Sequence, residues 1–129
     1  MRWLLLILVL AAACKPRPST ATPELTYRTF VDALQKGQAK AAWGLLSAPT
    51  RERVAAKSKL LSEASKGLVR DEPETLLFQG SRPGTITTIT QVRADESTAT
   101  LSVTSAAGTH EVKLVKDSGK WLVDLSDTL

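Results

Sequence analysis

The stretch TATLSVTSAAGTHEVKLVKDSGKWLVDL, residues 98–125, decides the fold class of this chain. Its first segment places apolar residues at every second position between threonines and serines, and this period of two predicts a strand with one buried face. Two turn sequences, Ala107-Gly108 and Asp117-Ser118-Gly119, reverse the chain twice, so the stretch predicts an antiparallel meander of three strands. The positions expected to face the core are Ala99, Leu101, Val103, Val112, Leu114, Trp121, Val123 and Leu125.

The residues before this stretch extend the predicted sheet. Residues 85–93 are rich in β-branched side chains, and their alternation slips between Ile86 and Ile89, which indicates a β-bulge. A shorter apolar run, residues 76–78, ends at Gly80 and is interpreted as another short strand.

The first half of the chain has a helical pattern. Thr22 and Pro23 suit the N-cap and the first position of a helix, and Gly37 suits its end. A second helix is expected over residues 38–46 and a third over residues 50–66. The apolar residues of the three helices are Tyr27, Phe30, Val31 and Leu34; Ala41, Ala42, Leu45 and Leu46; and Val54, Leu60, Leu61 and Ala64. Helices followed by an antiparallel meander predict an α+β domain with the helices packed on one sheet face.

Both ends of this domain resemble a known superfamily. The segments TPELTYRTFVDALQKG (22–37), AKAAW (39–43) and LLSAP (45–49), together with the ending KDSGKWLVD (116–124), are similar to the opening helices and final hairpin of the nuclear-transport-factor-2-like cone domains. The resemblance implies a sheet that curls around the helices and leaves a cavity. Some members of this superfamily are ketosteroid isomerases or dehydratases, and many are noncatalytic, including small bacterial lipoproteins.

The resemblance sharpens the expected architecture. We predict that three N-terminal helices pack into the concave face of a curved antiparallel sheet. The residues expected to be buried are Phe30, Leu34, Leu45, Leu61, Leu101, Val103, Val112, Leu114, Trp121 and Val123.

Cys14 is the one cysteine of the chain, and it follows a short apolar N-terminus that ends in three alanines. Residues 10–14, LAAAC, resemble the lipobox of a bacterial lipoprotein signal peptide, which implies that the Cys14 thiol is lipidated and the preceding residues are removed. The same residues are also compatible with an uncleaved anchor, an ordinary secretory signal or a buried N-terminal helix, although the run is shorter than the roughly 20 residues needed to span a bilayer.

This interpretation sets the predicted domain boundaries and the location. Residues 1–13 are the signal peptide, residues 14–22 the lipidated cysteine and a proline-rich tether, and residues 23–129 a single domain. The mature chain is expected in the cell envelope, anchored to a membrane and facing the periplasm. Lys15 lacks the Asp that retains many lipoproteins in the inner membrane, which favours the outer one.

Charge is divided unevenly along the chain. Residues 15–70 carry a net charge of +7, and residues 71–129 carry −4. This division argues against a general polyanion binder such as a nucleic-acid-binding protein, and it indicates one basic side. The basic residues of the third helix are either ordinary solvated surface or a docking face for anionic lipid or an acidic envelope partner; they are Arg51, Arg53, Lys57, Lys59 and Lys66.

Few residues are candidates for chemistry. His110 shares the alternation parity of Val112, and Tyr27 lies on the apolar side of the first helix, so both are candidates to line a pocket. Trp43 and Trp121 could floor such a pocket, although core packing is the simpler interpretation. Asp32 and Asp124 are expected to face solvent. Because Cys14 is assigned to lipidation and His110 stands alone, no metal site or cofactor is expected.

Two functions of different classes follow. The first is a noncatalytic, lipid-anchored envelope protein that binds a partner or small ligand through a cone-like domain. The second is a small cone-fold enzyme of the isomerase or dehydratase type with its site near His110 and Tyr27. A buried carboxylate within reach of either side chain would favour the enzyme.

Overall fold

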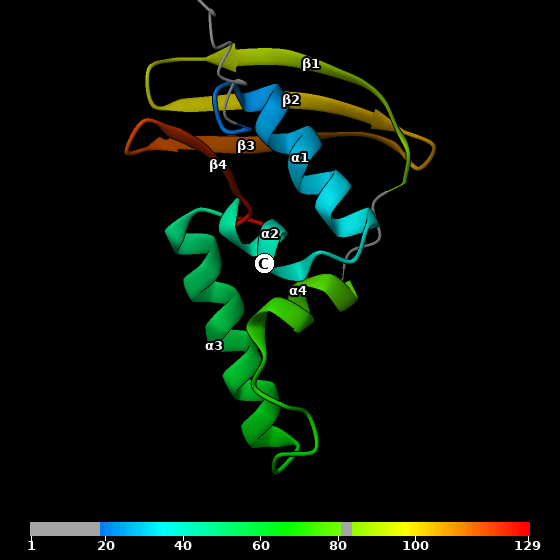
Figure 1. The fold of residues 1–129 in the computed structure, drawn as a ribbon, viewed down its shortest axis with the longest axis vertical. Coiled ribbons are helices and arrows are strands. Elements are labelled where there is room, and N and C mark those ends of the chain that lie inside the picture. Colours follow the sequence, from blue (N-terminus) through cyan, green and yellow to red (C-terminus); the bar gives the residue numbers. More distant parts are fainter. Residues whose placement is uncertain (1–18, 81–83) are drawn as a thin grey trace, which may run out of the picture.

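The computed structural model describes residues 19–80 and 84–129, which form four helices and four strands in an α+β arrangement (Figure 1). The helices are α1 (Pro23–Gln35), α2 (Ala39–Gly44), α3 (Ala48–Ala64) and α4 (Pro73–Gly80). The strands are β1 (Ile86–Ala94), β2 (Thr98–Ser105), β3 (Gly108–Asp117) and β4 (Lys120–Asp124). Among these described residues, no helix is both long and apolar enough to cross a membrane.

The strands form one antiparallel meander in the order β1-β2-β3-β4. Leu101 lies opposite Val112, and Leu114 lies opposite Val123, so the inward positions predicted from the alternation meet across the sheet. These four side chains are buried, which confirms the predicted register. The register of β1 shifts between Ile86 and Thr88, where a bulge was predicted, and again between Gln91 and Arg93, where none was.

Helix α1 covers one face of the curved sheet (Figure 1). Thr22 caps it by accepting a hydrogen bond from the Leu25 N–H, and Pro23 stands in its first turn, as predicted. Its apolar stripe, Tyr27, Phe30, Val31 and Leu34, is buried with the inward residues of the strands. The main core of the domain therefore lies between α1 and the sheet.

The outer edge of β4 is covered by two segments from the N-terminal half. The Trp121 N–H donates to the Thr20 carbonyl at 3.1 Å. The Val123 N–H donates to the Leu45 carbonyl, and the Ser47 N–H donates to the Val123 carbonyl, both at 2.8 Å. Thr20 falls in the range that we expected to be tether, so the folded domain already includes residues before Pro23.

Helix α4 corrects one prediction. Residues 76–78, interpreted above as a strand, lie within this helix, which packs against α2 and α3. The preceding residues start the helix: Pro73 is its first residue, and the Thr75 hydroxyl donates to the Glu72 carboxylate at 3.2 Å. A three-residue apolar run is too short for its periodicity to distinguish a strand from a helix.

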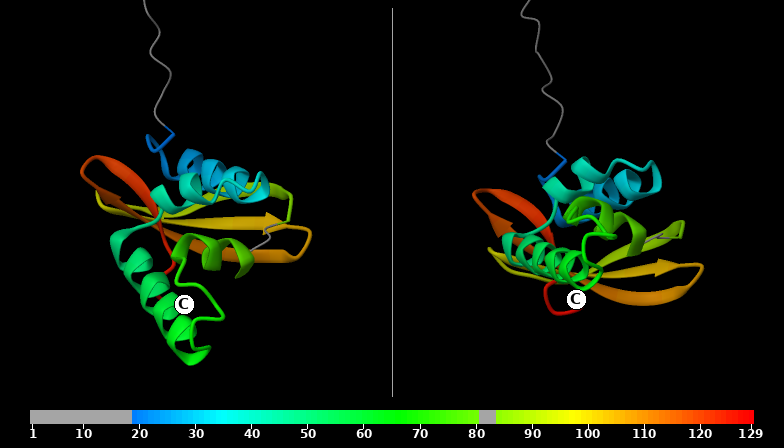
Figure 2. Two further views of the ribbon diagram at one scale, coloured as in Figure 1. Left: turned by 60° about the horizontal axis from the view of Figure 1, so that its bottom comes forward. Right: turned by 90° about the horizontal axis from the view of Figure 1, so that it is seen from below.

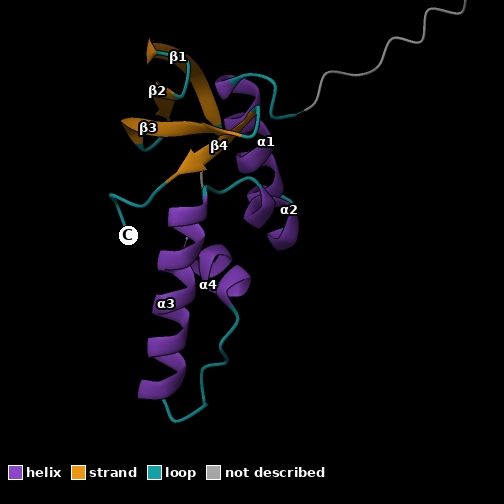
Figure 3. Ribbon diagram, turned by 90° about the vertical axis from the view of Figure 1, so that its left-hand side faces the viewer, coloured by secondary structure: helices purple, strands orange, loops and turns teal. Residues whose placement is uncertain are grey.

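Helix α3 corrects two more predictions. It begins at Ala48 rather than near residue 50, because Ser47 is its N-cap and accepts a hydrogen bond from the Thr50 N–H. Beyond its first turn it extends away from the sheet alongside α4 (Figures 2 and 3), so it does not fill the concave face as expected. Its buried positions are Thr50, Val54 and Ser58, whereas Leu61, predicted to be buried, is 39% exposed.

Candidate functional site

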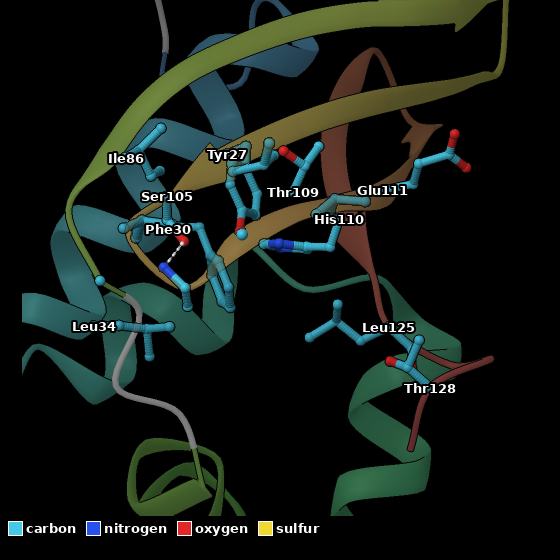
Figure 4. Close-up of a pocket in the computed structure, with 16 residues that line it drawn as sticks. Tyr27, Phe30, Leu34, Ile86, Ser105, Thr109, His110, Glu111, Leu125 and Thr128 are labelled. Atoms are coloured by element: carbon cyan, nitrogen blue, oxygen red, sulfur yellow. Dashed lines mark hydrogen bonds between the residues drawn. The ribbon is translucent and has the colours of Figure 1, made fainter.

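A cavity of about 600 Å³ opens between α1 and the end of the sheet where β2 turns into β3 (Figure 4). Phe30, Val31 and Leu34 of α1 form one wall. Val103 and Val112 of the sheet form another, and Leu125 and Thr128 of the C-terminal tail close a third side. The cavity exists because α1 covers the sheet without filling the space at the far end of the sheet. The walls of the cavity are mainly apolar.

Tyr27 of α1 and His110 of β3 project into this cavity from opposite elements, and Ser105 and Thr128 add hydroxyl groups to its lining (Figure 4). Tyr27 packs against Phe30 with ring centroids 6.3 Å apart, and burial raises the pKa of its phenol. Its hydroxyl therefore stays protonated and can donate a hydrogen bond at neutral pH. His110 is exposed at the rim, because it lies near the start of β3. Both residues were predicted from the sequence as candidates to line a pocket.

The carboxylate that lines this cavity is Glu111, and its side chain turns away from the interior (Figure 4). Glu111 follows His110 on the same strand, so the two side chains point to opposite faces of the sheet. Within the described residues that line the cavity, no carboxylate is placed beside Tyr27 or His110. The arrangement can offer hydrogen bonds to a bound molecule, but it lacks the paired acid and base of a proton-transfer site.

The two tryptophans considered for the pocket lie elsewhere. Trp121 is buried in the core, with the Lys116 ammonium 5.8 Å from its ring centroid. Trp43 is half-buried against the same core and borders a separate hollow beside the start of α4.

Asp124 corrects a further prediction. We expected it to face solvent because its parity is opposite to that of Trp121 and Val123, but its side chain is only 8% exposed. The Ser47 and Thr50 hydroxyls each donate to its Oδ1 at 3.1 Å, and the Ser126 hydroxyl donates at 2.7 Å. Parity identifies the face of a sheet on which a side chain lies, but here the first turn of α3 covers that face.

The charge state of Asp124 follows from these contacts. Burial by itself would raise the pKa of this carboxyl, but the hydrogen bonds from Ser126, Thr50 and Ser47 outweigh burial and lower the pKa. The Lys113 ammonium lies 3.7 Å from Oδ2. The carboxylate is therefore ionised and fully engaged.

This cluster also positions the third wall of the cavity. The Thr50 hydroxyl accepts a hydrogen bond from the Leu125 N–H at 2.9 Å, and the Thr128 N–H donates to the Leu125 carbonyl at 3.0 Å. Leu125 and Thr128 are thereby held against the pocket. This role was not predicted from the sequence, although Ser47, two residues before Pro49, is a candidate N-cap that could have pointed to it.

The basic residues of α3 and the turn after it lie on the surface. Arg53, Lys57, Lys59 and Lys66 are exposed, and Arg51 is half-buried. Within residues 19–80 and 84–129, none of the five forms an ion pair. Arg53 makes one long contact, from Nη1 to the Leu129 carbonyl oxygen at 3.4 Å.

The lipidation site and a possible metal site remain to be located. Cys14 and the predicted signal peptide, residues 1–13, lie outside the described residues. In the part of the chain that is described, no three metal-ligating side chains come together. No known protein family model matches the chain, and no curated protein sequence is significantly similar to it.

Proposed function

We propose that this chain is a lipid-anchored protein of the bacterial cell envelope whose domain binds a small, mainly apolar ligand in the cavity between α1 and the sheet. The observation that carries the proposal is the open cavity of about 600 Å³, whose walls are mainly apolar and into which Tyr27 and His110 project from opposite elements. Ligand pockets typically combine apolar walls with a small number of placed polar groups. The LAAAC sequence at residues 10–14 supports the anchor.

The same observation supports a cone-like fold of the nuclear-transport-factor-2-like kind. A curved antiparallel sheet, an opening helix across its face and a cavity between them are the features that the sequence resemblance implies. The departure is α3, which extends away from the sheet. We therefore assign the resemblance to α1 and the sheet and treat the α3–α4 pair as an addition to it.

Binding is favoured over catalysis by the direction of Glu111. An isomerase or dehydratase site near His110 and Tyr27 needs a general base beside the reacting atom. Glu111 turns out of the cavity, and Asp124, which is buried, is engaged by three hydroxyl groups elsewhere. The enzyme alternative would therefore depend on His110 alone.

The pocket is tested with anilinonaphthalene sulfonate, an apolar fluorescent anion, added to a form that begins at residue 15 and needs no detergent, because detergent micelles would themselves take up the dye. We expect saturable fluorescence enhancement that weakens about tenfold or more in Ala107→Phe, which places a ring at the mouth of the cavity; tenfold corresponds to about 1.4 kcal/mol. The matched control is Ala106→Phe, an exposed neighbour that does not line the cavity. Equal binding by both variants would contradict the pocket.

The anchor is tested separately by metabolic labelling with a fatty-acid analogue in producing cells. We expect Cys14→Ser to abolish labelling and to leave the signal uncleaved, because the thioether needs the thiol. Two or three acyl chains, at about 0.8 kcal/mol per buried methylene, hold a protein firmly at a membrane. Normal processing of the variant would contradict lipidation.

A further inference from the structure

Helix α3 has a second apolar face that the rest of the described chain does not cover. Leu60, Leu61 and Ala64 lie seven, eight and eleven residues after Arg53, with Lys57 between them, and this spacing places all five on one side of the helix. Leu60 is 66% exposed and Leu61 is 39% exposed. We call this surface, Arg53, Lys57, Leu60, Leu61 and Ala64, the outer face of α3.

The charge of the outer face is of one sign. Arg53 and Lys57 occupy its N-terminal half, whereas the acidic residues of the helix, Glu52 and Glu63, fall on another side. Neither Arg53 nor Lys57 forms an ion pair with another side chain of the described residues, and Arg53 makes only the 3.4 Å contact with the Leu129 main-chain oxygen. The outer face therefore combines an apolar patch with two positive charges that no acidic side chain of the described residues pairs.

The apolar surface continues beyond the end of the helix. Leu68 is 90% exposed and Val69 is 46% exposed in the turn that leads to α4. These two side chains and Leu61 border a cavity of about 370 Å³ between α3 and the following segment. Leu76 is the fourth apolar residue of its lining, and the other five residues are polar: Ser58, Arg70, Glu72, Thr75 and Gln79. An apolar side chain from outside can pack against the four apolar residues of this hollow.

We propose that the outer face of α3 binds an amphipathic helix of a partner protein, with acidic side chains of that helix opposite Arg53 and Lys57. Its apolar side chains would pack on Leu60 and Leu61 and reach the cavity beside Leu68. From Arg53 to Ala64 the face is about 16 Å long at 1.5 Å per residue, which matches three turns of a partner helix. Such a helix contacts its partner through residues spaced at i, i+3, i+4 and i+7.

Two observations favour a protein partner over a lipid surface. The hollow beside Leu61 suits an inserted side chain, whereas a bilayer offers a broad surface. Helix α3 also extends away from Ser19, where the described chain begins next to α1 (Figures 1 and 3). This second point rests on the proposed anchor at Cys14, because the tether would then hold the Ser19 side of the domain nearest the membrane.

The proposal is tested by photocrosslinking the full chain in the cells that produce it. Benzoylphenylalanine replaces Leu60, and the crosslinked peptides are identified by mass spectrometry. We expect one discrete protein adduct, mapped to a segment with acidic and apolar residues at helical spacing. Lys57→Glu should reduce this adduct about tenfold or more, because it reverses a charge on the outer face.

Lys59→Glu is the matched control, since Lys59 is equally exposed on the same helix but lies on the side of Glu52 and Glu63. It should leave the adduct unchanged, and both variants should accumulate to the normal level. Adducts with lipid alone, no adduct, a partner segment without that pattern, or equal losses in both variants would overturn the proposal. Labelling of Cys14, measured in the same cells, reports on the anchor independently.

Discussion

The region built from α1 and the sheet differs from the α3–α4 pair in what covers its apolar residues. In the first region, Phe30 and Leu34 of α1 meet Leu101 and Leu114 of the sheet in one core. In the second, Leu60 of α3 has a similar helical spacing but lies largely in solvent. Both regions have an apolar stripe, but within the described residues only the stripe of α1 is covered by other side chains.

The comparison separates two properties that a sequence pattern combines. Periodicity identifies a side of a helix or strand, whereas burial depends on a second element lying opposite that side. Leu61 was predicted to be buried from its spacing, but no part of the sheet lies opposite it. Asp124 shows the reverse case, because α3 covers a strand face that parity alone would leave in water.

The largest expected effect is in the core between α1 and the sheet. Leu114 is fully buried, so Leu114→Ala should lower the free energy of unfolding by about 2–5 kcal/mol through lost burial and a new cavity. Chemical denaturation of the two proteins measures the difference. A loss below about 1 kcal/mol would mean that this region is as loosely packed as the outer face of α3.

The next effect is at the junction of the two regions. Asp124→Ala removes the acceptor of the Ser47, Thr50 and Ser126 hydroxyls, and buried donors left unpaired cost about 1–3 kcal/mol. Because the hydroxyl groups around Asp124 also hold Leu125 against the pocket, binding of the probe anilinonaphthalene sulfonate should weaken as well. Unchanged probe affinity would show that the tail keeps its place without the cluster.

The pH dependence of stability should report on the same junction. The pKa of Asp124 is lowered in the folded state, so the unfolded chain binds its proton first as pH falls from the ordinary Asp value of about 3.9. The contribution of Asp124 to the free energy of unfolding is thus fully present above about pH 3.9. It is lost as the pH falls through the pKa that Asp124 has in the folded protein. Denaturation measured between pH 5 and pH 2 should show that the free energy of unfolding falls less steeply with pH in Asp124→Asn than in the unchanged protein.

Asp95 provides the comparison inside the sheet region. Hydrogen bonds from the Ser97 and Thr98 N–H groups and the Thr98 hydroxyl lower its pKa to about 2. Asp95→Asn should therefore also reduce the loss of stability at low pH, although only slightly, because solvent surrounds this exposed carboxyl and weakens its contribution. It should not affect binding of anilinonaphthalene sulfonate, because Asp95 lies in the turn between β1 and β2. A loss of probe binding in this variant would contradict the assignment of the pocket to the opposite end of these strands.

The smallest expected effect is on the outer face of α3. Leu60→Ala should change the free energy of unfolding by no more than about 0.5 kcal/mol, as for surface substitutions away from packed contacts. The same denaturation measurement checks it. A loss of about 2 kcal/mol would mean that this leucine is covered in solution, and the contrast between the two regions would disappear.

The local features of the fold could be predicted from the sequence, because adjacent residues determine them. Thr22 and Pro23 start α1, and the alternation at residues 99–103 sets the register of β2. Tyr27 and His110 were identified as pocket candidates because each shares the side of its element with core residues. For the apolar run 76–78, the sequence offered too few residues to choose between helix and strand, and packing against α2 and α3 decided for a helix.

The sequence by itself determined which side of each regular helix or strand is apolar, since that depends on spacing along one element. Only the tertiary structure decided which of these sides are covered. The pairing of Val123 with Leu45 and Ser47 placed the start of α3 on β4, and this buried Asp124 and sent the rest of α3 away from the sheet. Contacts between residues about 75 positions apart carry no local signal, because burial is a property of two surfaces that meet in space.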